Sequence, residues 1–141
     1  MVLGGGPLHL RKSLASLIVR FIKDHDDSDM VHTNWEDGLY QQILRLLSVG
    51  QVLAYIREGR MTGVFGWAFL DGITGVNKIR WTLPDNITGG HILYVSFGVI
   101  EKDERIGLVK KFFDESDFKF NEVIWRYKNR LFKTKRSMRN G

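Results

Sequence analysis

Hydrophobic residues recur at helical spacing in two stretches near the start of the chain. Over residues 7–23 apolar side chains return every three or four positions, which predicts an amphipathic helix. A second helix is predicted over 35–48, where apolar residues share one face and Gly50 marks the end. The acidic stretch 24–29, which contains His25, is predicted to be a loop that separates the two helices.

After residue 50 the pattern changes to the alternation and apolar runs that are typical of strands. Residues 51–57 and 62–70 predict a hairpin with its turn at Glu58-Gly59-Arg60. The long apolar run over 91–100 predicts a central strand that is buried on both faces. The other predicted elements are a short strand at 78–83, a helix at 103–116, and a strand at 121–127 that pairs with 131–135.

The order of these elements predicts one α/β domain. Antiparallel strands followed by a strand-helix-strand crossover build a mixed, mostly antiparallel sheet flanked by helices. This order is similar to the acyl-CoA N-acyltransferase (GNAT) fold. A chain of 141 residues is long enough for one such domain. We therefore expect a single domain over 1–141, with a flexible start at 1–6 and a flexible basic end at 137–141.

Composition excludes several classes of protein. The chain has no cysteine, so a disulfide scaffold and a Cys-based zinc site are ruled out. No apolar run approaches the roughly 20 residues of a membrane-spanning helix. The N-terminus lacks the order of a secretion signal, which favours a cytoplasmic protein. The spacing of histidines and carboxylates does not match a set of metal ligands, so no metal is expected.

The net charge of +5 comes from the C-terminal segment. Seven Lys and Arg residues, and no acidic residue, follow Glu122. Such a segment attracts polyanions, which include nucleic acid, an acidic protein and the phosphates of a cofactor. The alternative is a solvated tail, against which the interleaved apolar residues of 124–132 argue for the first part of the segment.

Two polar residues stand where side chains can reach a site. His32 precedes the second helix, where it is either a helix-start residue or a group that faces a site. Asp103 follows the central strand, where it either caps the next helix or acts beside a bound donor. His9, His25 and His91 are interpreted as surface or strand-end residues.

The segment around His32 resembles a known family. Val31-His32-Thr33-Asn34-Trp35 is similar to the Leu-His-x-Asn-Trp segment of the toxin-activating lysine-acyltransferases, which fatty-acylate pore-forming RTX toxins. The resemblance spans about residues 30–136. Further matches are Gly66-Trp67-Ala68 for a Ser-Trp-Ala, the spacing from Thr88-Gly89 to Asp103, and Lys110-Lys111-Phe112. The chain departs from the family on the central strand, where Ser96-Phe97-Gly98-Val99-Ile100 replaces Asp-Trp-Ile-Ala-Pro.

The resemblance implies acyl transfer from a thioester donor to a lysine amine of a protein. The donor is acyl-acyl carrier protein in the family, with acyl-CoA as the alternative. His32 would be the general base, oriented by Asp103. Backbone N–H groups near Gly98 would stabilise the developing oxyanion. The donor would be held by Arg105, Lys110 and Lys111, because a carrier protein is acidic and coenzyme A bears phosphates.

A second class of function fits the same sequence. An acyltransferase fold without catalysis can serve as a binding module, since fold does not imply function. Its basic C-terminal segment would then hold nucleic acid or an acidic protein. Whether the chain forms a homodimer stays open at this point.

Overall fold

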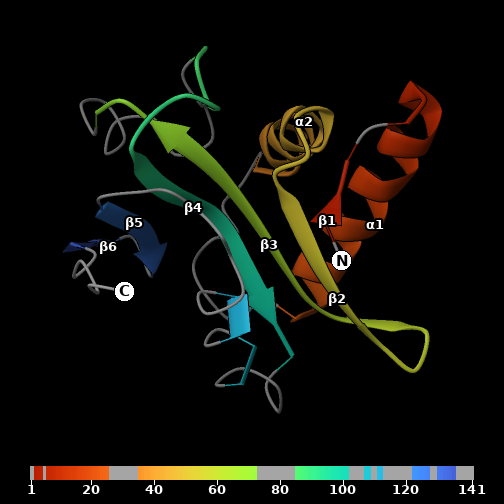
Figure 1. Cartoon of the computed structure of the whole chain (residues 1–141). Coiled ribbons are helices and arrows are strands. Elements are labelled where there is room, and N and C mark those ends of the chain that lie inside the picture. Colours follow the sequence, from red (N-terminus) through yellow and green to blue (C-terminus); the bar gives the residue numbers. More distant parts are fainter. Residues whose placement is uncertain are drawn as a thin grey trace.

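The computed structural model describes residues 2–4, 6–25, 35–72, 85–101, 107–108, 111–112, 122–127 and 130–135. In this part of the chain one six-stranded sheet carries two helices on one side (Figure 1). The elements are β1 (Val2–Leu3), α1 (Leu8–His25), α2 (Trp35–Ser48), β2 (Val52–Arg57), β3 (Arg60–Leu70), β4 (Ile92–Ile100), β5 (Glu122–Tyr127) and β6 (Arg130–Lys135).

Strand order in the sheet follows chain order from β1 to β6. Every neighbouring pair is antiparallel except β4 and β5, which are parallel. The predicted α/β class, with a mixed and mostly antiparallel sheet flanked by helices, is confirmed. Residues 107–108 and 111–112 are helical, as predicted, whereas the predicted strand at 78–83 lies outside the described residues.

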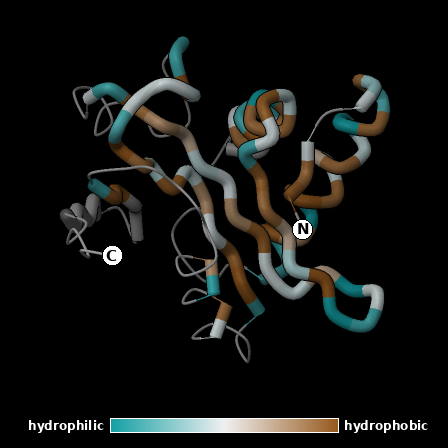
Figure 2. The backbone as a smooth tube through the Cα atoms, viewed as in Figure 1, coloured by the Kyte–Doolittle hydropathy of each residue, from teal (hydrophilic) through white to brown (hydrophobic). Residues whose placement is uncertain are grey.

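The predicted hairpin is formed by β2 and β3. Glu58 and Gly59 form its turn with φ angles of 53° and 73°. Two successive positive φ values match the right-handed twist of the flanking strands, and glycine adopts one of them without strain. Figure 2 shows this turn as hydrophilic, while hydrophobic residues run along the strands behind it.

Two features of the N-terminal part were not predicted. Val2 and Leu3, within the start that is predicted to be flexible, pair with Leu53 and Val52 at the edge of the sheet. The outer edge of β2 offers free backbone groups, and pairing satisfies them. His25 was expected in a loop but ends α1, because its Nδ1 is hydrogen-bonded to the Phe21 carbonyl at 3.0 Å.

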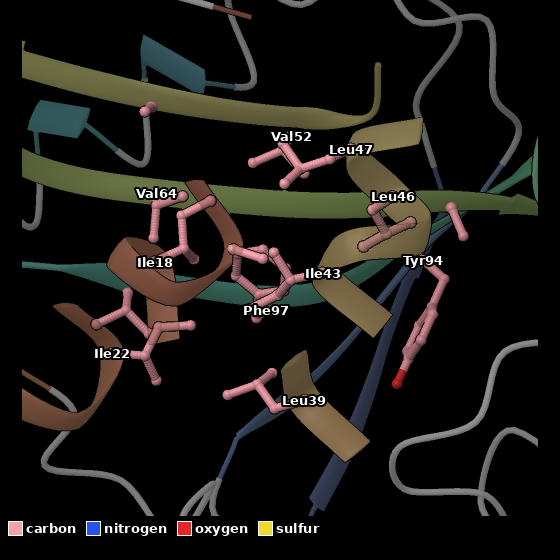
Figure 3. Packing of buried hydrophobic residues seen from close by; sticks show 14 of the residues in the cluster. Ile18, Ile22, Leu39, Ile43, Leu46, Leu47, Val52, Val64, Tyr94 and Phe97 are labelled. Carbon is pink, nitrogen blue, oxygen red and sulfur yellow. The ribbon is translucent and has the colours of Figure 1, made fainter. Parts of the chain in front are cut away.

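The main core lies between the two helices and the sheet. Ile18 and Ile22 of α1 and Leu39 and Ile43 of α2 are fully buried against the strands (Figure 3). Burial of each such side chain contributes about 1.5–3 kcal/mol of hydrophobic stabilisation. Phe97 of β4 lies in the same cluster, which we call the helix-face core.

The opposite face of the sheet has a smaller core rich in aromatic residues, which we call the aromatic-face core. Phe112 is fully buried there, and its ring stacks on Phe65 with centroids 4.3 Å apart. Tyr55 meets Phe65 edge-on at 6.1 Å, and Trp67 lies 5.7 Å from Phe112. Both faces of the central strands are therefore covered, as the apolar run over 91–100 predicts.

A buried side-chain amide helps to hold the chain before β4 against β3. The Gln51 side chain donates from Nε2 to the carbonyls of Trp67 at 2.9 Å and Ile87 at 3.0 Å. Gly90 passes so close to Leu70 that a Cβ at this glycine would lie 2.0 Å from the Leu70 carbonyl carbon. These contacts fix where β4 begins and therefore which residues of β4 face β3.

Candidate functional site

The parallel ladder between β4 and β5 covers only the first part of β4. It runs over residues 92–95 and ends with the pair Val95↔Trp125. Beyond this pair, residues 96–100 of β4 pair with β3 alone, and residues 126–127 of β5 pair with β6 alone. In Figure 1, β4 continues past β5 toward its arrowhead. We call this divergence, formed by residues 96–100 and 126–127, the strand fork.

The strand fork leaves one edge of β4 without a strand neighbour. Among the described residues, no strand pairs with residues 96–100 on the side away from β3. A strand edge presents backbone N–H and C=O groups that can pair with another extended chain. Most such edges lie at the border of a sheet, whereas this one lies between its two halves.

A β-bulge coincides with the end of the ladder. Val95 pairs with Trp67 and Phe97 pairs with Gly66, so Ser96 is an extra residue with no partner position on β3. A bulge bends its strand and increases the local twist. The bend starts at the residue where β4 leaves β5, which accounts for the position of the strand fork.

Two glycines let β3 and β4 stay in contact through the bent region. A Cβ at Gly66 would lie 2.2 Å from the Phe97 ring, and a Cβ at Gly98 would lie 2.9 Å from the Phe65 ring. Each phenyl ring therefore covers the glycine that it pairs with across the strands. Gly98 itself is exposed, so the backbone of β4 reaches the surface within the strand fork.

Ser96 has a buried hydroxyl group without a hydrogen bond. The residue is 8% exposed, and its Oγ contacts no donor or acceptor in the described part of the chain. An unsatisfied buried hydroxyl costs about 1–3 kcal/mol. Ser96 was not predicted from the sequence, although a small polar residue within the otherwise apolar stretch 92–100 was an available signal.

Lys111 places a positive charge on the aromatic-face core. Its exposed side chain holds Nζ 5.5 Å from the centre of the Tyr55 ring. Tyr55 contacts Phe65, and Phe65 covers Gly98. Through these rings, the structure brings two predicted donor-binding residues, Gly98 and Lys111, to the same face of the sheet.

The remaining predicted site residues are not among those that the structure describes. They are His32, Asp103, Arg105 and Lys110. The last described residue before His32 and the last described residue before Asp103 meet. His25 Nε2 lies 3.7 Å from Glu101 Oε1, and Arg60 also pairs with Glu101. Glu101 directly follows β4 and is only 14% exposed, so this contact joins the end of α1 to the end of β4.

The described residues hold no group of three His, Asp or Glu side chains that is suited to a metal ion. Neither of the described helices is both long and apolar enough to span a bilayer.

No protein-family model and no curated protein matches the chain. Two solved structures are loosely similar to it. An N-acetyltransferase from Staphylococcus aureus Mu50 has a TM-score of 0.42 and 13% identity over 89% of this chain and 80% of that one. An acetyltransferase has a TM-score of 0.38 and 13% identity over 84% and 76% of the two chains. At these values the likeness identifies no residue of a site and no substrate.

Proposed function

We propose that the chain is an acyltransferase that moves an acyl group from a thioester donor to a lysine amine of a protein. The observation that carries this proposal is the strand fork, where residues 96–100 of β4 keep an edge without a strand neighbour among the described residues. This edge supports the binding of an extended ligand that contains amide groups.

A thioester donor has the chemistry to occupy such an edge. Acyl carrier protein and coenzyme A both present the acyl group on a pantetheine arm, which is an extended chain with two amides. Amides of a ligand pair with a strand edge as another strand does. The exposed backbone at Gly98 lies where the arm would run, and its N–H is our proposed donor to the thioester oxygen as negative charge develops.

The proposed reaction is a direct attack of the amine on the thioester. A lysine amine is protonated at neutral pH and must lose a proton before it attacks. His32 takes that proton, and Asp103 orients the imidazole and stabilises its charged form. The new N–C bond forms as the C–S bond breaks, and the thiolate leaves and is protonated.

The contact between His25 and Glu101 supports the pairing of His32 with Asp103. The sequence alone gives no reason for the two to meet. The segment that carries His32 starts from His25, and Asp103 follows two residues after Glu101. Since His25 and Glu101 are 3.7 Å apart, both segments leave from the same end of β4.

Positive charge on the aromatic face of the sheet, over β2, supports an anionic donor. Lys111 lies on the aromatic-face core, and we assign Lys110 and Arg105 to the same role. An acidic carrier protein would be attracted to these residues, and the phosphates of coenzyme A would be bound by the same charges.

The experiment compares two histidine variants for thiol release from acyl-CoA and acyl-acyl carrier protein in the presence of lysine peptides. His32→Ala is expected to lower the rate about 10²–10⁴-fold, because it removes a general base. His9→Ala is the matched control, since His9 is exposed on α1 and is expected to leave the rate unchanged. A folded His32→Ala variant with the wild-type rate would remove His32 from the reaction.

A binding module without catalysis is the second candidate, and one observation favours it. The hairpin of β5 and β6 carries Arg126, Arg130, Lys133 and Lys135 at the end of the described sheet. A nucleic acid held by such charges would dissociate steeply between low and moderate salt. Salt-sensitive RNA or DNA binding together with no thiol release from either donor would favour this candidate over acyl transfer.

A further inference from the structure

Three segments of the chain meet at the carboxylate of Glu101. Arg60, at the start of β3, pairs with its Oε1, and the same oxygen lies 3.7 Å from His25 Nε2 at the end of α1. The imidazole forms an ion pair with this carboxylate when it is protonated. The Glu101 side chain is 14% exposed and that of Arg60 is 65% exposed, so the carboxylate is enclosed at the point where α1 meets β4. We call His25, Arg60 and Glu101 the charged junction.

The two side chains that join α1 to β4 are each held by their own surroundings. The Glu101 backbone N–H donates to the Thr62 carbonyl at 2.9 Å, so this residue stays bound to β3 after β4 ends. The His25 ring is hydrogen-bonded through Nδ1 to the Phe21 carbonyl at 3.0 Å and stacks on the Phe21 ring with centroids 4.3 Å apart. Phe21 itself is buried in the helix-face core. A contact between two supported side chains sets the separation of the elements that carry them.

The charged junction is not what holds α1 on the sheet. Ile18 and Ile22 are fully buried, and their burial attaches the helix to the strands. An ion pair whose basic partner is open to solvent adds little to stability beside such packing. The junction lies at the last residue of α1 and at the first residue after β4, so its effect is on where these two ends lie relative to each other.

We propose that His25 and Glu101 are positioning residues for acyl transfer: their contact fixes the separation between the end of α1 and the end of β4, and the rate depends on that separation. This inference rests on the proposed function, in which His32 follows α1 in the sequence and Asp103 follows β4. A displacement of about 1 Å can lower the rate of a reaction about 100-fold. A small change at the junction therefore has a large effect on the rate.

The test replaces the contact by a covalent link that can be removed again. The chain has no cysteine, so His25→Cys/Glu101→Cys introduces two thiols, which a short bifunctional thiosulfonate reagent joins. Without the link, acyl-peptide is expected to form about 10–100-fold more slowly than in the wild type, with little change in the donor KM. The link is expected to restore most of the rate, and dithiothreitol to remove this gain. Acyl-peptide is measured by mass spectrometry, so that added thiols do not interfere.

Ser13→Cys/Ser16→Cys is the matched control, because both serines are exposed and lie within one turn of α1. This variant should keep the wild-type rate with and without the link. A wild-type rate in unlinked His25→Cys/Glu101→Cys, or a slow rate that the link does not restore, would overturn the inference. The second outcome would show that the two side chains act in some way other than by positioning.

Amide exchange at the end of α1 separates this inference from the proposed function. In the unlinked variant the amides of residues 21–25 are expected to exchange several-fold faster than in the wild type, and the link should return them to the wild-type rate. This exchange pattern in a wild type that forms no acyl-peptide would overturn the proposed function and leave the junction as the contact that fixes the two ends. Exchange that is the same in all three samples would overturn the inference whether or not the chain transfers acyl groups.

Discussion

The two parts of β4 have the same sequence character but different surroundings. Residues 92–95 pair with β3 on one side and β5 on the other, whereas residues 96–100 pair with β3 alone. Both parts are apolar and contribute to the cores on the two faces of the sheet. The change occurs at one residue, the bulged Ser96, where the hydrogen-bonding pattern is interrupted.

This difference shows how a sheet can form a site without losing its core. Phe97, Val99 and Ile100 stay buried on the faces of the sheet, so the bend keeps the hydrophobic contacts. Only the backbone edge of β4 on the side away from β3 lacks a neighbouring strand among the described residues. Binding at such an edge uses backbone N–H and C=O groups, which nearly every residue carries. The position of the unpaired edge is therefore set by the bulge and by the two glycines that the phenyl rings cover.

The largest expected effect comes from removing the packing that holds the bent part of β4. Phe97 is 1% exposed and covers Gly66, so Phe97→Ala leaves a cavity in the helix-face core. We expect a loss of about 3–5 kcal/mol in the free energy of unfolding, measured by denaturant titration. Leu17→Ala, at a position 57% exposed on α1, is the control and should change it by less than about 0.5 kcal/mol. A loss below about 1 kcal/mol for Phe97→Ala would mean that this ring does not support the strand.

A smaller effect is expected from filling the exposed position of the strand fork. The Cβ of Gly98→Ala would approach the Phe65 ring to 2.9 Å, so the ring must shift. We expect a cost of about 1–3 kcal/mol in stability. We also expect weaker binding of octanoyl-pantetheine, because the ring moves beside the edge that the arm uses.

Gly72→Ala provides the matched control for Gly98→Ala. A Cβ at Gly72 meets nothing within 4 Å, and this exposed glycine lies at the end of β3, away from the strand fork. Its stability and affinity should stay at wild-type values. Wild-type donor affinity in Gly98→Ala would argue that the arm does not follow β4.

The smallest effect is expected from the charge beside the aromatic-face core. Lys111→Gln removes the cation over Tyr55, which contributes about 0.5–1 kcal/mol at an exposed site. Binding of an acidic acyl carrier protein should weaken and become less sensitive to salt, while binding of uncharged octanoyl-pantetheine should not change. Lys12→Gln on the exposed side of α1 is the control. An equal loss with both donors would indicate that Lys111 acts through packing.

Local patterns in the sequence were sufficient for most of the helices and strands. The second helix has the predicted bounds, Trp35–Ser48, because its apolar face and the glycine at its end are both local signals. The pairing of Val2 and Leu3 was missed, since a two-residue strand has no pattern of its own and depends on the edge of β2. The end of α1 was missed for a related reason: the contacts of His25 with the Phe21 carbonyl and with Glu101 outweigh the acidic sequence around it.

The geometry of the candidate site could not be predicted from the sequence of β4 alone, because it depends on how β4 pairs and packs with other segments. The run over 91–100 predicts a buried strand, but the bulge at Ser96 follows from its register against β3. Gly98 and Lys111 are connected only through contacts among Phe65, Tyr55 and Phe112. These three rings come from separate segments of the chain, so no local pattern predicts their contacts. The roles of His32 and Asp103 stay predictions, carried by the resemblance of residues 31–35 and by the meeting of the flanking residues His25 and Glu101.

Hydrogen exchange of the β4 amides, measured by NMR with and without octanoyl-CoA, tests the central claim most directly. Residues 92–95 are paired on both sides, so their amides should exchange slowly in both samples. In residues 96–100, amides that point away from β3 should exchange fast in the free protein and slowly once the donor is bound. Saturated donor binding with unchanged exchange over 96–100 would contradict the assignment of this edge as the donor site.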